Sequence, residues 1–314
     1  MSTAGPPLLV TGATGFLGAW IARRAAEDGR HVLACDLSED RRRFEQIAPA
    51  PQVAKRIEWL RLDVTDPAAA RALVLEREPS AIVHLAALQI PACAADPRLG
   101  ARVNIEGHIN IFDAARARGV PVIYASSAAA KPRGAANAPA TLYGVYKQAD
   151  EGIARLYWRD HAVPSMGLRP YIVYGVGRDQ GETSALTAAM RAAAEGRAYE
   201  IPFRGRFCFQ YAADVADAFL RAAEAVREGA ATSDMSSTLE SVEAVRDAIR
   251  AAVPDARITI ENVSREGPSD FDTRPLDAIA PNRAATPLAR GVAETVAAFR
   301  DVAHAAPALG FGPD

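Results

Sequence analysis

The first half of the chain alternates short apolar runs with longer segments whose apolar residues recur at helical spacing. The apolar runs are bounded by glycine, proline or charge, which predicts buried strands at 8–11, 31–36, 57–63, 81–86, 120–126 and 165–171. The helical spacing predicts helices at 16–28, 67–77, 104–118 and 142–160. Strands that alternate with helices of this length predict an α/β fold, with a parallel sheet covered by helices on both faces.

The pattern loosens beyond Gly175. Helices are expected at 183–195, 214–228, 239–253 and 292–302, and an extended segment at 198–202. Segments 5–7, 134–139 and 265–275 are rich in turn formers and read as loops. No internal repeat, low-complexity tail or domain linker interrupts the chain.

Composition narrows the class of protein. With 49% apolar and 24% charged residues, the chain is typical of folded domains. A net charge of −2 provides no global positive field for a nucleic acid or an anionic membrane. No apolar run approaches the roughly 18 residues of a membrane span, and the N-terminal residues lack the pattern of a secretory signal. Three distant cysteines without a C-x-x-C pair indicate a reducing cytoplasm and neither a disulfide framework nor a zinc site.

A glycine-rich turn, Thr11-Gly12-Ala13-Thr14-Gly15-Phe16-Leu17-Gly18, follows the first predicted strand and opens the first predicted helix. Glycine at every third position suits a tight turn, a close approach to a pyrophosphate and close packing of helix on strand. The helix N-terminus would supply N–H groups and a positive dipole end for the phosphates. In this strand–helix context the motif indicates a dinucleotide site rather than an ordinary tight turn.

Two acidic positions at strand ends bear on the choice of dinucleotide. Asp36 ends the second predicted strand, where a carboxylate accepts hydrogen bonds from ribose hydroxyls and repels a 2′-phosphate. This favours NAD over NADP, and the neighbouring run Arg41-Arg42-Arg43 reads as a solvated helix start. Asp63-Val64 either meets the adenine edge, or Asp63 joins Asp66 in capping the next helix.

Tyr143 and Lys147 lie four residues apart at the start of a predicted helix and therefore share a face. A nearby ammonium stabilises a phenolate, and such a tyrosine can exchange a proton with a substrate hydroxyl while hydride moves to or from nicotinamide. Ser127, just after the fifth strand, can hydrogen-bond the same oxygen. Tyr146 points elsewhere and is expected to pack or to line the substrate. Without the upstream motifs, Tyr143 would read as a core aromatic and Lys147 as a solvated side chain.

Together these motifs resemble the extended short-chain dehydrogenases/reductases, in the NAD-dependent epimerase/dehydratase family. The resemblance runs from about residue 8 to 300. It rests on the glycine turn, Asp36, Asp63-Val64, His84-Leu85-Ala86-Ala87, Asn104, Ser126-Ser127, Tyr143 with Lys147, Leu168-Arg169-Pro170 through Gly175, and Tyr211 with Asp214-Val215. It implies a doubly wound parallel (Rossmann) sheet with a smaller C-terminal substrate lobe. Residues 1–175 and about 206–235 would bind NAD, and about 176–205 with 236–314 would form the substrate-binding lobe.

The resemblance also assigns roles to residues. The implied catalytic residues are Ser127, Tyr143 and Lys147. The implied cofactor-binding residues are Gly12, Thr14, Gly15, Phe16, Leu17, Asp36, Asp63, Val64, Leu85, Ala86, Ala87, Asn104, Ala125, Tyr143, Lys147, Tyr171 and Val173. The implied substrate-binding residues are Ser127, Ala128, Tyr143, Ile172 and Arg206. Asn104 would support the backbone of the site, no metal is implied, and relatives often form homodimers. His84, inside a buried strand, is expected to be a hydrogen-bonded core residue.

The chain departs from the family pattern where many relatives hold a nucleotide diphosphate. Those relatives often carry asparagine at the position of Ile172 and arginine at the position of Phe207. Each such contact is worth roughly 1.5–3 kcal/mol when charge-assisted, so the loss of both would weaken the binding of a nucleotide sugar. The sequence therefore favours a smaller substrate without a diphosphate. Five arginines could still bind a carboxylate or phosphate, but each also reads as an ion-pair partner: Arg169, Arg178, Arg204, Arg206 and Arg274.

The sequence therefore predicts an NAD-dependent oxidoreductase. It would transfer hydride between the cofactor and a secondary alcohol or ketone of a small sugar, sugar acid or polyol, with Tyr143 as general acid/base. One alternative is a nucleotide-sugar epimerase or dehydratase with tightly bound NAD. Another is a non-catalytic NAD-binding protein, against which the intact Tyr143 and Lys147 argue.

Overall fold

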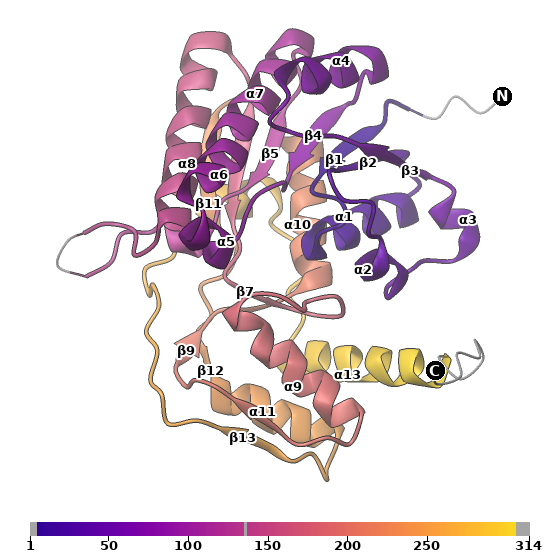
Figure 1. The fold of residues 1–314 in the computed structure, drawn as a ribbon, viewed down its shortest axis with the longest axis vertical. Helices are drawn as coiled ribbons and strands as arrows, with labels where there is room; N and C mark the ends of the chain where they lie inside the picture. The colour runs from indigo at the N-terminus through magenta and orange to yellow at the C-terminus, as the bar shows by residue number, and fades with distance from the viewer. Residues whose placement is uncertain (1–4, 135–136, 306–314) are drawn as a thin grey trace. The chain divides into compact units, whose positions relative to one another are not determined.

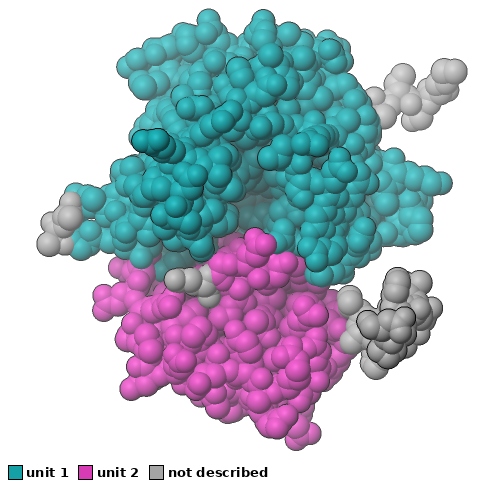
Figure 2. Space-filling view, viewed as in Figure 1, with its two compact units in different colours: residues 1–171, 213–237, 270–284 teal, residues 172–212, 238–269, 285–314 magenta. Residues whose placement is uncertain are grey.

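The computed structural model describes residues 5–134 and 137–305, so the expected loop at 134–139 lies partly outside the described residues. The chain divides into two compact units, coloured separately in Figure 2. Unit 1 comprises residues 1–171, 213–237 and 270–284, and unit 2 comprises residues 172–212, 238–269 and 285–314.

Unit 1 is built on a seven-stranded parallel sheet with the strand order β11-β6-β5-β4-β1-β2-β3 (Figure 1). The strands are β1 (Leu8–Thr11), β2 (Val32–Asp36), β3 (Ile57–Arg61), β4 (Ala81–His84), β5 (Val122–Ala125), β6 (Ser165–Arg169) and β11 (Ala230–Asp234). The chain winds outward from β1 to β3 and then, on the other side of β1, from β4 to β11. This order confirms the predicted doubly wound sheet.

Helices flank this sheet. They are α1 (Phe16–Glu27), α2 (Arg42–Glu45), α3 (Pro51–Ala54), α4 (Pro67–Arg77), α5 (Ile90–Ala95), α6 (Pro97–Ala101), α7 (Gly107–Arg118), α8 (Leu142–His161), α10 (Ala212–Ala225) and α12 (Arg274–Ile279). α7 packs against α4 and α8, while the Arg24 guanidinium of α1 pairs with Asp217 of α10. Leu9, Leu33, Ile82 and Phe112 are buried together in the core between sheet and helices.

The strands and helices that the sequence predicts for unit 1 are present in the structure, but their ends differ by a few residues. Several strands stop short of the predicted residue, because the chain leaves the ladder at the carboxyl edge of the sheet. The first three residues of the helix predicted at 104–118 lie in a π-helical turn at Arg102–Glu106, and α7 begins at Gly107. β11 was not predicted, since its sequence Ala-Ala-Thr-Ser-Asp contains no large apolar residue and it forms an edge strand.

In its described residues, unit 2 contains three α-helices, α9 (Ala185–Ala194), α11 (Val242–Ala252) and α13 (Leu288–Ala305). α13 packs against both α9 and α11. A side chain at Gly291 of α13 would overlap the hydroxyl of Tyr174, so this contact requires glycine. Three two-stranded ladders complete the unit: β7 (Ile172–Tyr174) with β10 (Phe209–Tyr211), β8 (Tyr199–Ile201) with β13 (Ile258–Ile260), and β9 (Arg206–Phe207) with β12 (Glu240–Ser241).

The unit boundaries differ from the predicted domain boundaries in three segments. Segments 172–175 and 206–212 belong to unit 2, because β7 and β10 pair with each other in a ladder separate from the large sheet. Segment 270–284 belongs to unit 1, because the backbone of Asp272 exchanges hydrogen bonds with the backbone and carboxylate of Asp234 in β11.

Within the residues that the structure describes, none of the helices has both the length and the apolar character needed to cross a bilayer.

Candidate cofactor and active site

The glycine turn joins β1 to α1 and lies against the end of β4. Gly12 has φ +71°, and a Cβ there would lie 2.7 Å from the amide nitrogen of Ala86 and 2.8 Å from the carbonyl carbon of Leu85. A Cβ at Gly18 would overlap the carbonyl oxygen of Gly12. The two glycines therefore permit the close backbone approaches that the motif predicts, and the turn meets Leu85-Ala86 directly.

The N-terminus of α1 fits an anion. Gly15 precedes the helix with extended backbone, no side chain caps it, and the first turn of α1 contains no acidic residue. The predicted residues Phe16 and Leu17 form that first turn and are half-buried. A helix start with these properties can receive a phosphate through its backbone N–H groups.

Asp36 lies beside this turn, at the end of β2. Its Oδ2 accepts a hydrogen bond from the backbone N–H of Thr14 at 3.0 Å, and its Oδ1 accepts one from Ser38. The carboxylate is half-buried, so free lone pairs can still meet ribose hydroxyls. The neighbouring arginines start α2 as expected: Arg42 pairs with Asp40, and Arg41 lies over the Trp59 ring.

Asp63 does not share in capping α4. Asp66 alone caps that helix by accepting from the N–H groups of Ala68 and Ala69. Asp63 instead accepts from both the backbone N–H and the hydroxyl of Thr65, and these hydrogen bonds lower its pKa. Val64 is buried against Gly107. The adenine contact of Asp63-Val64 stays a prediction.

His84 is the hydrogen-bonded core residue that the sequence predicts. Its Nδ1 lies 2.8 Å from the Thr11 hydroxyl oxygen, and only 4% of the residue is exposed. Burial lowers the pKa of this imidazole, and the nearby His108 and Lys147 lower it further. His84 is therefore neutral and joins β4 to β1.

Asn104 supports the loop that follows β4, as the sequence suggests. Its Oδ1 accepts from the backbone N–H of Leu88 at 2.7 Å, and its Nδ2 donates to the Leu88 carbonyl at 3.1 Å. The residue is buried in the π-helical turn, a distortion often found at functional sites. Asn104 therefore holds the backbone at Leu88, directly after the predicted contacts Leu85, Ala86 and Ala87, and its effect on a cofactor stays a prediction.

Tyr143 and Lys147 share the predicted face at the start of α8. Thr141 caps this helix by accepting from the N–H of Gly144. Tyr143 and Lys147 are 8% and 4% exposed, and the Lys147 ammonium lies 5.9 Å from the Tyr143 ring centroid. Burial acts to lower the pKa of Lys147, but Asp150, at 3.2 Å, and Tyr143 outweigh it, so the net direction is upward. The ammonium is therefore charged at neutral pH.

Ser127 lies against the same helix start. A Cβ at Gly144 would overlap the carbonyl oxygen of Ala129, so the loop after β5 touches α8 at the residue next to Tyr143. The Ser127 hydroxyl accepts from the N–H of Ala129 at 3.1 Å and remains half-buried. Ala125 ends β5 just before it, and Ala128 is buried with its N–H donated to Pro170. The structure thus brings the Ser127 loop and the Tyr143 helix together.

Tyr146 has a packing role. Its hydroxyl donates to the carbonyl of Pro97 at 2.9 Å, and its ring meets Gly100 of α6. The residue next to Lys147 therefore holds α8 on α6, in accord with the packing interpretation of the sequence.

Glu151 and Asp150 are buried on α8, and sequence reasoning did not select them. Glu151 pairs with Arg169 of β6 and accepts from the hydroxyl of Ser126, while Asp150 pairs with Lys147. The signal in the sequence was a pair of consecutive acidic residues on a helix expected to cover a sheet. Buried carboxylates need partners, so this pair could have predicted buried ion pairs.

The remaining predicted residues lie outside this cluster. Tyr171 ends unit 1, with its ring 6.0 Å from that of Phe271. Ile172, Val173 and Arg206 lie in unit 2, the first two buried in β7 and the third donating to the Leu239 carbonyl. Their contacts with cofactor or substrate stay predictions.

The five arginines that could bind an anion all have protein partners. Arg169 pairs with Glu151, Arg204 with Glu243 and Arg274 with Asp272, while Arg178 donates to the Thr183 hydroxyl and Arg206 to a backbone carbonyl. The ion-pair interpretation therefore describes Arg169, Arg204 and Arg274.

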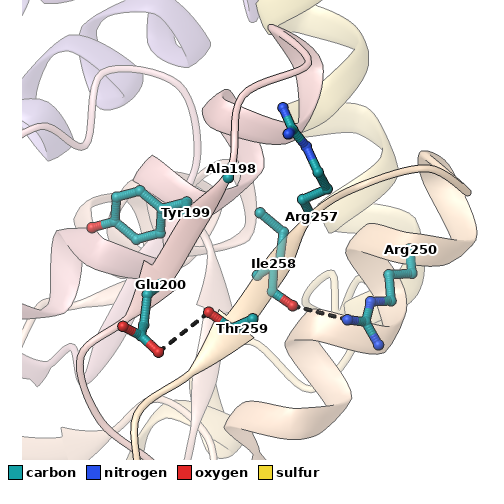
Figure 3. Close-up of a pocket in the computed structure, with 7 residues that line it drawn as sticks. All are labelled: Ala198, Tyr199, Glu200, Arg250, Arg257, Ile258 and Thr259. Atoms are coloured by element: carbon teal, nitrogen blue, oxygen red, sulfur yellow. Dashed lines mark hydrogen bonds between the residues drawn. The ribbon is translucent and has the colours of Figure 1, made fainter.

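A cavity of about 320 Å³ lies in unit 2, and none of the predicted site residues lines it (Figure 3). It lies between β8, β13 and α11, and its lining residues are Ala198, Tyr199, Glu200, Arg250, Arg257, Ile258 and Thr259. Its polar groups are largely engaged: Arg250 donates to the Ile258 carbonyl and Thr259 to Glu200, as the dashed lines in Figure 3 show. This cavity is therefore not the candidate active site.

Comparison with known proteins agrees with this geometry. The model of the NAD dependent epimerase/dehydratase family matches residues 8–236. UDP-glucose 4-epimerase of Mycolicibacterium smegmatis is 31% identical over 68% of this chain and 72% of its own length. Among solved structures, L-threonine dehydrogenase from Clostridium difficile has a TM-score of 0.82 at 20% identity, covering 94% of this chain and 98% of that one. UDP-glucose 4-epimerase of Thermus thermophilus, solved as a complex with NAD, has a TM-score of 0.72 at 22% identity, covering 94% and 99%.

The fold and the site define a dinucleotide-binding enzyme of the short-chain dehydrogenase/reductase type. The chain belongs to the NAD-dependent epimerase/dehydratase family, and its cofactor is NAD. The glycine turn, the uncapped start of α1 and the carboxylate of Asp36 form a cradle that fits this group.

Proposed function

We propose that the protein is an NAD-dependent oxidoreductase acting on a secondary alcohol or ketone of a small sugar, sugar acid or polyol. NAD, when bound, supplies the acceptor or donor of hydride. In the direction of oxidation, Tyr143 takes the proton of the substrate hydroxyl, and in the direction of reduction it returns a proton to the carbonyl oxygen. The proximity of the Lys147 ammonium to the Tyr143 ring, in a buried site, carries this proposal.

The other residues of the site have supporting roles in the proposal. Ser127 hydrogen-bonds the substrate oxygen, because its half-buried hydroxyl lies on the loop that touches the start of α8. The Gly12 turn and Asp36 hold NAD, with Asn104 fixing the adjoining loop. Unit 1 binds NAD, and unit 2 contributes to substrate binding.

The side chains of unit 2 support a substrate without a diphosphate. Phe207 packs in an aromatic cluster with Phe203 and Phe209, and Ile172 is 1% exposed. Neither side chain can form the charge-assisted hydrogen bonds that a diphosphate requires.

The test is turnover with NAD and a panel of polyols, sugar acids and L-threonine, followed by the absorbance of NADH. L-threonine belongs in the panel because several structural neighbours are named as its dehydrogenases. Tyr143→Phe is expected to lower kcat at least about 100-fold. Tyr146→Phe is the matched control and keeps its activity, because its hydroxyl is bonded to Pro97.

The second candidate is an epimerase or dehydratase of nucleotide sugars, favoured by the 31% identity to a UDP-glucose 4-epimerase. Such an enzyme retains NAD through purification and converts a UDP-sugar without net NADH. Turnover of a UDP-sugar combined with no NADH from any member of the panel would replace the first proposal by this one.

We also propose a homodimer and a cytoplasmic location. α8 exposes Leu142, Val145 and Leu156 at 43–49%, a row of apolar side chains on one helix. Val145→Glu combined with Leu156→Glu is expected to convert a dimer into a monomer in light scattering, and a wild type that is already monomeric contradicts the dimer. The cytoplasmic location is supported by the three buried free cysteines.

A further inference from the structure

Two buried ionisable residues next to Lys147 have no role in the function proposed above. Asp150 of α8 is fully buried, and His108 of α7 is 1% exposed. Burying ionisable groups is costly unless they are paired, so their presence beside a proposed active-site ammonium requires a physical reason.

Asp150 is the partner of Lys147. Its Oδ2 lies 3.2 Å from the Lys147 Nζ. The adjacent Glu151 points to a different side of the helix, where Arg169 and Ser126 use both of its oxygens. The charge of Glu151 is thus balanced by Arg169, and Asp150 is left to balance Lys147.

His108 faces the other oxygen of Asp150. Its Nδ1 lies 4.0 Å from the Asp150 Oδ1, and its ring is fixed by Phe112, Tyr124 and His84 at centroid distances of 4.6, 4.9 and 5.5 Å. Among the described residues, neither nitrogen of His108 nor the Oδ1 of Asp150 has a hydrogen-bond partner. Buried polar atoms without a partner are rare in folded proteins, so this cluster requires an explanation.

We propose that Asp150, whose other oxygen lies beside the His108 ring, is a positioning residue, which holds the Lys147 ammonium charged and aimed at the Tyr143 side of the site. This inference rests on the proposed function, because it assigns Asp150 to a Lys147 that works with Tyr143 and NAD.

The electrostatics of the cluster fit this role. Burial raises the pKa of Asp150 to about 6, against the opposing effect of Lys147, so the carboxylate is ionised at neutral pH. Burial lowers the pKa of His108 to about 3, so the imidazole is neutral there. The ionisable groups around the pair are Tyr143 and Glu151 on α8, His108 on α7, His84 on β4, Tyr124 on β5 and Cys93 on α5. Of these, Glu151 is neutralised by Arg169.

The first experiment measures NAD affinity as a function of pH for wild type, Asp150→Asn and the exposed control Asp160→Asn. Burial without a counter-charge lowers the pKa of a lysine by several units, so Lys147 is expected to lose its charge as the pH rises in Asp150→Asn. The NAD affinity of this variant is therefore expected to fall at least about tenfold between about pH 6 and pH 9. Wild type and Asp160→Asn are expected to change less than about threefold over that range. Parallel profiles for Asp150→Asn and wild type would overturn the proposal.

The second experiment needs neither cofactor nor substrate. Infrared difference spectra of wild type labelled with carboxyl-¹³C aspartate follow protonation of the buried Asp150, and Lys147→Met removes its counter-charge. The Asp150 midpoint is expected to rise by at least about one pH unit in Lys147→Met, since burial then acts on the carboxyl without its counter-charge. An unchanged midpoint in Lys147→Met would contradict the proposal. This comparison does not depend on whether Asp150→Asn folds. If the midpoint shifts while Tyr143→Phe keeps full turnover, the proposed function fails and the pairing survives.

Discussion

Arg169 holds Glu151 through two parallel hydrogen bonds, from Nε at 2.7 Å and from Nη2 at 2.6 Å. Glu151 lies on α8, one turn beyond Lys147, and Arg169 ends β6. The same carboxylate accepts from Ser126 at 2.5 Å, next to Ser127. One buried ion pair therefore ties the helix of Tyr143 to the strand ends beneath it.

Breaking this pair is expected to destabilise the fold. Glu151→Gln removes the bidentate partner of the largely buried Arg169 and leaves it only Asp234, at 3.8 Å and already paired with Lys131, which costs up to about 3–5 kcal/mol. Arg159→Gln on the same helix breaks an exposed pair with Asp160 and is expected to leave the stability nearly unchanged, because solvent screens this pair. Urea denaturation measures the free energy of unfolding of both variants. Equal losses of stability would show that the buried pair contributes no more than the exposed pair.

Two glycines inside helices are predicted to respond oppositely to alanine. A Cβ at Gly18 overlaps the carbonyl oxygen of Gly12, whereas at Gly152 the nearest atom is an Arg155 side-chain nitrogen at 3.9 Å. Gly18→Ala is expected to cost about 1–3 kcal/mol or more by overpacking and to weaken NAD binding. Gly152→Ala is expected to stabilise by roughly 0.5–1 kcal/mol, because alanine is the better helix former. A neutral Gly18→Ala would contradict the close approach in the turn.

The features that the sequence predicted are local ones. The glycine turn, the Tyr143–Lys147 pair and the cap at Asp66 each span only a few residues, so their geometry follows from helix and turn periodicity. The order of the strands follows from the alternation of strands and helices together with the family resemblance.

The features that the sequence did not predict depend on contacts between distant segments. His108 meets Asp150 only because α7 packs against α8, and Lys131 reaches Asp234 at 2.7 Å only because β11 joins the sheet beside β6. The short strands of unit 2 likewise pair across long stretches of chain. No residue pattern within one segment encodes such contacts.

Asp36 is expected to set the preference for NAD. Asp36→Ala removes the charged acceptor of the ribose hydroxyls and the repulsion of a 2′-phosphate, so NAD affinity should fall about 10- to 100-fold and the discrimination against NADP should shrink. Asp40→Ala, on the same loop but paired with Arg42, is the control and should keep the wild-type ratio. Equilibrium binding of both dinucleotides measures the ratio. A wild type that binds NADPH as tightly as NADH contradicts the role of Asp36.

The buried His108 and Asp150 are expected to give opposite contributions to the pH dependence of stability. The folded pKa of His108, about 3, lies below the unfolded value of about 6.5, so unfolding takes up a proton and stability falls as pH drops from about 6.5. The folded pKa of Asp150, about 6, lies above the unfolded value of about 3.9, so its contribution falls as pH rises from about 4 to about 6.

Each proton changes the slope of the unfolding free energy by about 1.4 kcal/mol per pH unit. Between about pH 4 and pH 6, His108→Leu is therefore expected to flatten the rise of stability with pH by up to that amount, and Asp150→Asn to steepen it by a similar amount. Urea denaturation at a series of pH values measures the three slopes. Equal slopes in His108→Leu and wild type would mean that His108 takes up its proton in the folded state, and the neutral imidazole facing Asp150 would then be wrong.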